Sequence, residues 1–144
     1  MFQDLPQRAQ RPQRGVLSEA SNDPLTEKII GAAIEGHRVL GPGLLESVYE
    51  EALCHEFDRR GIRYLRQAPI EMIYKGKSIK NQRIDLLVEE GSDRVIIDLK
   101  SVSRLPEVST AQVLSYLKAT GIRRGLVINF GEKRLVDGVR RISL

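Results

Sequence analysis

The chain has 144 residues, of which 41% are hydrophobic and 29% are charged, and its formal net charge is +4 at pH 7. These values are ordinary for a single soluble domain with a real core. The single cysteine, Cys54, excludes an internal disulfide, and no apolar run approaches the length of a membrane span or a signal-peptide core. We therefore expect one cytoplasmic domain.

Residues 1–22 are rich in Gln, Arg, Pro and Ser and have no hydrophobic period. This composition predicts a disordered extension. Asp23 and Pro24 then supply an N-cap acid and the proline favoured at the first helical position. We therefore assign residues 23–144 to the folded domain.

Two helices are predicted at the start of this domain. The apolar face of the first consists of Leu25, Ile29, Ile30, Ala33, Ile34 and Leu40, and it ends at residues 41–43, Gly-Pro-Gly. The apolar stripe of the second consists of Leu45, Val48, Tyr49, Ala52, Leu53 and Phe57, and Gly61 is a natural stop. Glu46 lies one position off this stripe in the first turn, where it could lean toward a sheet. The helix dipole also favours a solvated glutamate there.

The middle of the chain is predicted to form strands at residues 62–65, 70–74, 78–88 and 94–99, bounded by turns at residues 75–76 and 91–92. Because strand side chains alternate, Asp98 and Lys100 share one face of the last of these strands. A turn at residues 89–93 makes the last two strands a hairpin, which can bring Asp85 beside Asp98. A buried carboxylate is costly unless it is paired or holds a metal, so the cluster indicates either an ion pair or a metal site.

The third predicted helix contains Val108, Ala111, Val113, Leu114, Leu117 and Lys118 and ends near Gly121. Gln112 and Tyr116 are four residues apart on it and therefore stack on one face, although Tyr116 could simply be part of the core. A strand at residues 126–130 follows, and then a last short hairpin that pairs 134–136 with 139–143. This order predicts an α/β fold with a central mixed β-sheet flanked by helices.

Charge is segregated along the chain. Residues 59–83 hold eight basic residues and one acid, Glu71. A second basic zone is C-terminal and consists of Lys118, Arg123, Arg124, Lys133, Arg134, Arg140 and Arg141. Basic clusters around a carboxylate centre would attract a polyanion, whereas the alternative is a solvated surface that keeps the protein soluble.

Two motifs resemble a known family. Gly43, Glu46 and Tyr49 match the pattern that names the GxxExxY family, and Asp85 with residues 98–100, Asp-Leu-Lys, resembles the catalytic signature of the PD-(D/E)XK nuclease superfamily to which that family belongs. The resemblance runs from Asp23 to the C-terminus. It implies a PD-(D/E)XK nuclease-like core.

The resemblance also implies roles for individual residues. Asp85, Asp98 and the Leu99 carbonyl would hold Mg²⁺ or Mn²⁺, Lys100 would orient the attacking water, and Glu46 would complete the metal shell through a water or a second ion. Gln112 and Tyr116 would position the substrate. The function expected from these roles is hydrolysis of phosphodiester bonds in nucleic acid, with DNA as the expected substrate, and a homodimer is expected by analogy.

Two alternatives stay open from the residues alone. The first is a nuclease-fold module that binds nucleic acid or a protein without cutting. The second is a structural or regulatory subunit in which Asp98 and Lys100 form only a salt bridge.

Overall fold

The computed structural model describes residues 23–144, so the extension predicted for residues 1–22 lies outside the described part of the chain. The elements follow in the order α2 (Pro24–Leu40), α3 (Glu46–Arg60), β1 (Arg63–Tyr74), β2 (Lys77–Glu90), β3 (Asp93–Lys100), α4 (Val108–Thr120), β4 (Arg124–Asn129), the 3-10 helix η3 (Leu135–Gly138) and β5 (Val139–Ser143). The strands form one sheet in the order β1-β2-β3-β4-β5. The β3–β4 pair is parallel and the other pairs are antiparallel, which confirms the predicted mixed sheet.

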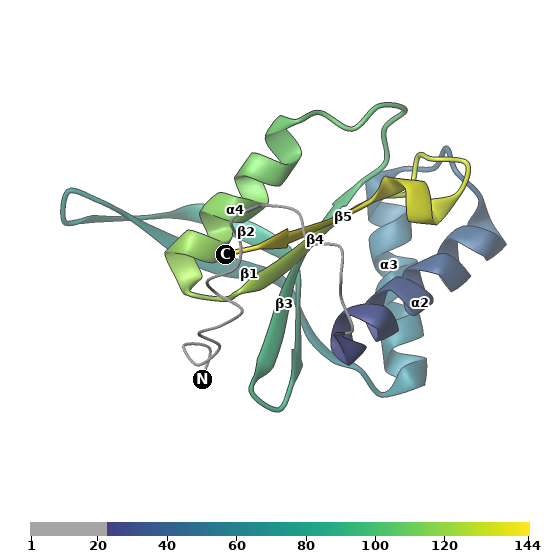
Figure 1. Ribbon diagram of the computed structural model, residues 1–144, viewed down its shortest axis with the longest axis horizontal. Helices are drawn as coiled ribbons and strands as arrows, with labels where there is room; N and C mark the ends of the chain where they lie inside the picture. The colour runs from purple at the N-terminus through teal and green to yellow at the C-terminus, as the bar shows by residue number, and fades with distance from the viewer. Residues whose placement is uncertain (1–22) are drawn as a thin grey trace.

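The sheet is covered on both faces, by α2 and α3 on one side and by α4 on the other (Figure 1). The core is accordingly divided into two clusters. Val95, Ile97 and Leu99 of β3 pack in the cluster with α2 and α3, whereas Ile96 packs in the cluster with α4. A strand buried on both faces explains the uninterrupted apolar run before Asp98.

Local signals place the helix ends where they were predicted. The Asp23 carboxylate accepts from Leu25 N and from the Thr26 hydroxyl, and it also forms an ion pair with Arg124, so the N-cap is tied to β4. Gly41 and Gly61 end α2 and α3 with positive φ angles of 74° and 71°.

Two strand predictions are wrong. The strands predicted at residues 62–65 and 70–74 form one continuous strand, β1, which begins at Arg63 and passes through Pro69. An edge strand tolerates proline because its outer N–H groups need no ladder partner. Residues 134–136 form no strand. The chain turns through η3 instead, because Leu135 is buried in the core and Gly138 lies against the Asn129 carbonyl, where a Cβ would clash.

The predicted apolar faces are partly wrong as well. Leu45 is 74% exposed, since it precedes α3 as its N-cap instead of lying under the helix. The other predicted apolar residues of these helices that are exposed are Ile34, Leu40, Val48, Val108 and Ala111. Within residues 23–144, no helix is long and apolar enough to cross a membrane.

Candidate active site

Asp98 and Lys100 lie at the C-terminal end of β3, the central strand of the sheet. Asp98 is only 8% exposed, and its Oδ2 lies 3.3 Å from Lys100 Nζ. That approach is an ion pair without hydrogen-bond geometry, so among the described residues the buried Oδ2 has no hydrogen-bond donor. A buried carboxylate oxygen without a donor is uncommon and is typical of functional sites.

Asp85 lies where β2 separates from β3. The backbone pairing of the two strands ends at Leu86 and Ile97, and the next residue of β2, Asp85, instead accepts a hydrogen bond from Leu99 N at 2.8 Å. Since the N–H and C=O of one strand residue point to the same side, the Leu99 carbonyl also faces the β2 side, where the ladder has stopped. The structure thus brings together two carboxylates, one lysine and one strand carbonyl.

Burial dominates the electrostatics of this cluster. It raises the pKa of Asp98 to about 6, with Lys100 opposing the shift and the Asp85 charge adding to it. Burial likewise raises the pKa of Asp85, and the Leu99 N–H opposes that shift. The pKa of Glu46 is raised by partial burial, with Lys100 lowering it and Asp85 raising it. Raised carboxylate pKa values mean that ionising these carboxyl groups is unfavourable in the metal-free site. A bound cation would stabilise their ionised forms.

Glu46 begins α3, and a buried hydrogen-bond network fixes the loop that precedes it. Tyr49 donates its hydroxyl to the Gly41 carbonyl and accepts from Leu44 N at 3.1 Å, while its ring stacks on Phe130 at 4.5 Å. The Ser101 hydroxyl, just after β3, donates to the Leu44 carbonyl at 2.6 Å. The loop is therefore anchored both to the core and to the end of β3, and α3 starts beside Lys100.

Replacing Tyr49 by phenylalanine should lower the free energy of unfolding by about 1–3 kcal/mol, because the ring stays packed while two backbone groups of the 41–44 loop lose their partner. Urea denaturation measures this loss. Tyr64→Phe is the matched control, since that hydroxyl donates to the exposed Asp58 and its removal should change stability by at most about 0.5 kcal/mol. Equal effects of the two substitutions would contradict the anchoring role.

Glu50 and Gln67 also border the acidic cluster, although the sequence pattern did not indicate either of them. Glu50 accepts from Arg66 Nε at 3.0 Å and from Gln67 Nε2 at 3.2 Å, which ties α3 to β1 beside the acidic cluster. Gln67 has a positive φ of 52°, and its side chain lowers the pKa of Asp85. The sequence signal that could have found Glu50 is its position four residues after Glu46, on the same helix face.

Gln112 and Tyr116 lie on the α4 side of the site and contact each other, with Gln112 Nε2 donating to the Tyr116 hydroxyl at 2.9 Å. The hydroxyl donates in turn to Oε1 of Gln82 on β2 at 3.1 Å, a partner that the sequence did not indicate. Burial raises the pKa of Tyr116, and the nearby charge of Asp98 adds to this shift. The chain of three side chains thus connects α4 to β2 next to the carboxylates.

The donor set fits a hard divalent cation. Among the described residues, no three His, Cys, Asp or Glu side chains are placed to hold a metal together. The oxygens available are instead the two carboxylates of Asp85 and Asp98 and the Leu99 carbonyl, and Asp98 Oδ2, which is in an ion pair with Lys100 but accepts no hydrogen bond from the described residues, could bind a metal. Oxygen ligands of this kind suit Mg²⁺ and Mn²⁺, which keep several waters in their coordination shell.

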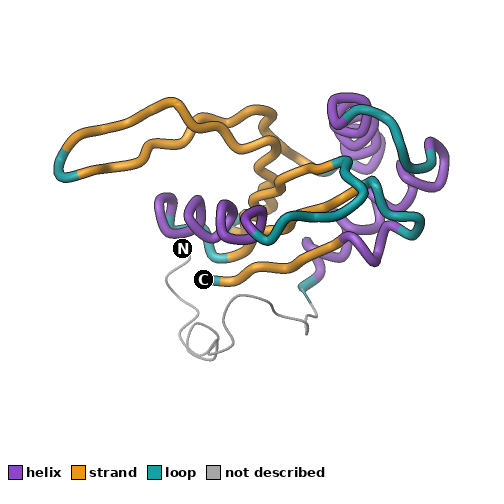
Figure 2. Tube along the Cα trace, turned by 90° about the horizontal axis from the view of Figure 1, so that it is seen from above, coloured by secondary structure: helices purple, strands orange, loops and turns teal. Residues whose placement is uncertain are grey.

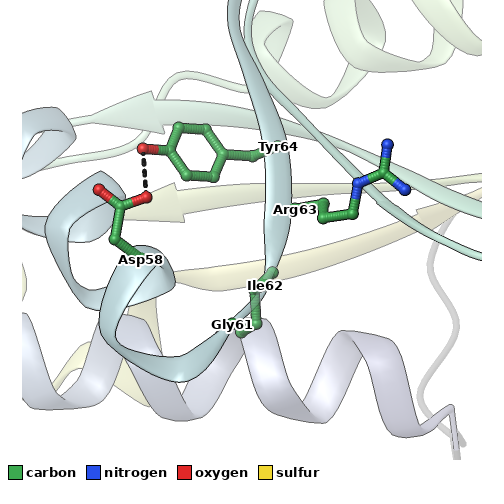
Figure 3. A pocket seen from close by; sticks show the side chains of 5 residues that line it. All are labelled: Asp58, Gly61, Ile62, Arg63 and Tyr64. Atoms are coloured by element: carbon green, nitrogen blue, oxygen red, sulfur yellow. Dashed lines mark hydrogen bonds between the residues drawn. The ribbon is translucent and has the colours of Figure 1, made fainter.

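A surface pocket elsewhere on the chain does not contribute to this site. Figure 3 shows its lining residues, Asp58, Gly61, Ile62, Arg63 and Tyr64, with the hydrogen bond from Tyr64 to Asp58. In the strand register, Arg63 of β1 lies opposite Glu89 of β2, and Glu89 lies opposite Arg94 near the start of β3. The pocket therefore lies toward the end of the sheet opposite Lys100.

Comparison with known proteins gives one family match. A family model described as PD-(D/E)XK nuclease superfamily matches residues 23–142. No curated protein matches the chain. The match covers nearly all of the described residues and includes every element that contributes a side chain to the cluster.

Proposed function

The chain belongs to the PD-(D/E)XK nuclease superfamily, and from this membership we propose that it is a metal-dependent nuclease that hydrolyses phosphodiester bonds of nucleic acid, with DNA as its substrate. We also assign it to the GxxExxY branch, because Gly43, Glu46 and Tyr49 each have a physical role in this chain. Gly43 adopts a φ of 101°, Glu46 starts the helix next to Lys100, and Tyr49 holds the loop between them.

The observation that carries the proposal is the buried Asp98 oxygen that has no donor within the described residues, 3.3 Å from the Lys100 amine and next to Asp85. A purely structural ion pair would be expected to satisfy both carboxylate oxygens with donors. A metal ligand must instead keep a lone pair free.

Each residue then has a definable task. Asp85, Asp98 and the Leu99 carbonyl would hold Mg²⁺ or Mn²⁺, which when bound neutralises phosphate charge and acidifies a water. Lys100 is half-buried beside Asp98, where its ammonium can orient the nucleophile and stabilise negative charge that develops on the phosphate. Glu46 faces the same centre from α3 and can accept a proton from water. Gln112 keeps a second amide hydrogen that can donate to a substrate strand from α4, and the buried Tyr116, whose hydroxyl donates to Gln82, would position the Gln112 side chain.

The test is a cleavage assay on labelled substrates: single-stranded DNA, duplex DNA, a four-way DNA junction, single-stranded RNA and duplex RNA. Each substrate is incubated with Mg²⁺, Mn²⁺ or EDTA, and Asp98→Asn protein serves as the control for a contaminating nuclease. We expect metal-dependent cleavage of DNA by the wild type alone. Cleavage that persists in EDTA or in the variant would contradict the proposal, and so would absence of cleavage on every substrate with either metal.

A further inference from the structure

The β1–β2 hairpin continues far beyond the rest of the sheet. Pairing of β2 with β3 stops at Leu86, yet β1 and β2 stay paired out to Tyr74 and Lys77. Both views show this hairpin projecting from the body of the molecule, on the side away from α2 and α3 (Figures 1 and 2). We refer to residues 68–84 as the arm.

The outer part of the arm is strongly basic. Residues 71–83 contain Lys75, Lys77, Lys80 and Arg83 with one acid, Glu71. Within residues 23–144 none of these four cations has a carboxylate partner.

Several basic residues in the body of the domain, by contrast, form ion pairs with carboxylates. Arg60 pairs with Glu56, and Arg66 pairs with Glu50 and Glu51. In the C-terminal basic zone, Arg124 pairs with Asp23 and Asp93, and Arg141 pairs with Glu27. Part of the basic charge of the body is therefore internally compensated, whereas none of the four arm cations has a carboxylate partner among the described residues.

The tip of the arm also exposes apolar side chains. Ile73 is 63% and Tyr74 is 60% exposed, and Lys75 Nζ lies 5.5 Å from the centre of the Tyr74 ring. A two-stranded ribbon of this kind has the width that a duplex groove admits. Lysines beside an exposed aromatic ring suit a partner that offers both phosphates and flat or apolar surfaces.

The base of the arm is fixed relative to the candidate active site. Ala68, Ile70 and Ile84 pack in the α4 core cluster, and Gln82 accepts from Tyr116. The direction of the arm is thus set by the same helix that borders Asp98. Lys77 is eight residues beyond Asp85, which at about 3.3 Å per residue places it up to roughly 26 Å from that carboxylate.

We propose that the arm binds the duplex flank of the nucleic-acid substrate, with its lysines on phosphates within about eight base pairs of the scissile bond. The distance follows from a rise of about 3.4 Å per base pair. The inference rests on the proposed nuclease function and deepens it, because it makes duplex on one side of the cut part of what the enzyme recognises.

The test compares wild type with the variant Lys75→Gln/Lys77→Gln/Lys80→Gln. The matched control is Arg59→Gln/Lys133→Gln/Arg134→Gln, which removes the same charge from α3 and from the loop before η3, at the opposite end of the molecule (Figure 1). The cut position is first mapped on a 5′-labelled duplex of about 30 base pairs, and the flank on each side is then shortened in steps. Circular dichroism and thermal melting check that all three proteins are folded.

For the wild type we expect cleavage to slow once the flank on one side falls below about eight base pairs. The arm variant should cleave the full duplex as slowly as the wild type cleaves the shortened one, and further shortening should not affect it. The control should behave like the wild type. An arm variant that keeps the full dependence on flank length, or a control that loses it equally, would overturn the inference.

Binding in EDTA separates this inference from the nuclease proposal. The affinity for the same duplex, measured by fluorescence anisotropy, should fall with salt, and the slope of log K against log [salt] should decrease by about three in the arm variant. If the slope decreases in the arm variant but the wild type cleaves no substrate, the result would support nucleic-acid binding by the arm and contradict the proposed nuclease activity. Cleavage by an arm variant with an unchanged slope and unchanged flank dependence would contradict only the proposed role of the arm.

Sedimentation equilibrium tests whether the tip of the arm instead binds a second copy of the chain. If Ile73→Ser/Tyr74→Ser changes the molecular mass of the protein in solution, the tip binds a second copy and the proposal fails.

Discussion

Replacing Asp98 by asparagine is expected to lower phosphodiester cleavage by roughly a thousandfold or more while making the metal-free protein more stable at neutral pH. The loss of activity follows because the amide has no negative charge to hold a cation and offers only one acceptor oxygen. The gain in stability follows from burial, which raises the pKa of Asp98 from 3.8 to about 6. Ionising this carboxyl therefore costs more in the folded chain than in the unfolded one.

The pH dependence of that gain has a definite sign. Between about pH 4 and pH 6 the folded metal-free protein binds more protons at Asp98 than the unfolded chain does, so the stability of the wild type falls as pH rises through this window. A shift of this size corresponds to at most about 3 kcal/mol. Urea denaturation in EDTA should show the two proteins equal near pH 4 and the variant about 1–3 kcal/mol more stable by pH 7.

Added Mn²⁺ supplies the control for this prediction. The wild type should be stabilised, by about 2.7 kcal/mol at a hundredfold excess over Kd, and the variant should not be. If Asp98→Asn unfolds more easily than the wild type in EDTA, and the wild type gains nothing from Mn²⁺, then Asp98 and Lys100 form a structural salt bridge and the metal site is refuted.

Replacing Lys100 by methionine is expected to lower cleavage by roughly a hundredfold to a thousandfold, with the opposite effect on stability. Methionine keeps the apolar stem but removes the ammonium that lies 3.3 Å from Asp98 Oδ2. Because Lys100 opposes the effect of burial, its removal should move the pKa of Asp98 further up and cost about 1 kcal/mol at pH 7 in EDTA.

Metal binding distinguishes the two substitutions. Lys100 is not a proposed ligand, so Lys100→Met protein should still be stabilised by Mn²⁺, whereas Asp98→Asn protein should not. Differential scanning fluorimetry over a Mn²⁺ titration measures this difference. Loss of Mn²⁺ stabilisation in both variants would indicate that the lysine acts only by holding the local structure.

Much of the fold was predictable because its signals are local. The alternation along residues 95–100 predicted which side chains of β3 share a face, and the two core clusters confirm that Ile96 lies opposite Val95, Ile97 and Leu99. Asp23 and Gly61 likewise predicted helix ends, since capping depends on a few neighbouring residues. The closeness of Asp85 to β3 followed from the short turn between two strands, which restricts the register of a hairpin.

Other features depended on contacts between distant residues. Glu50 is hydrogen-bonded to Gln67, and Tyr116 is hydrogen-bonded to Gln82. The partners are 17 and 34 residues apart in the sequence, and no periodicity in the sequence specifies them. The point at which β2 leaves β3 opens the cluster and begins the arm, and it depends on how the strands pair and twist in the folded sheet. Whether a given arginine forms an ion pair with a carboxylate or remains available to an external anion also depends on the tertiary structure. The sequence by itself determined the side chains, the faces of β3 and the helix ends; only the tertiary structure decided which charges meet, because electrostatic pairing depends on distance in space and on burial.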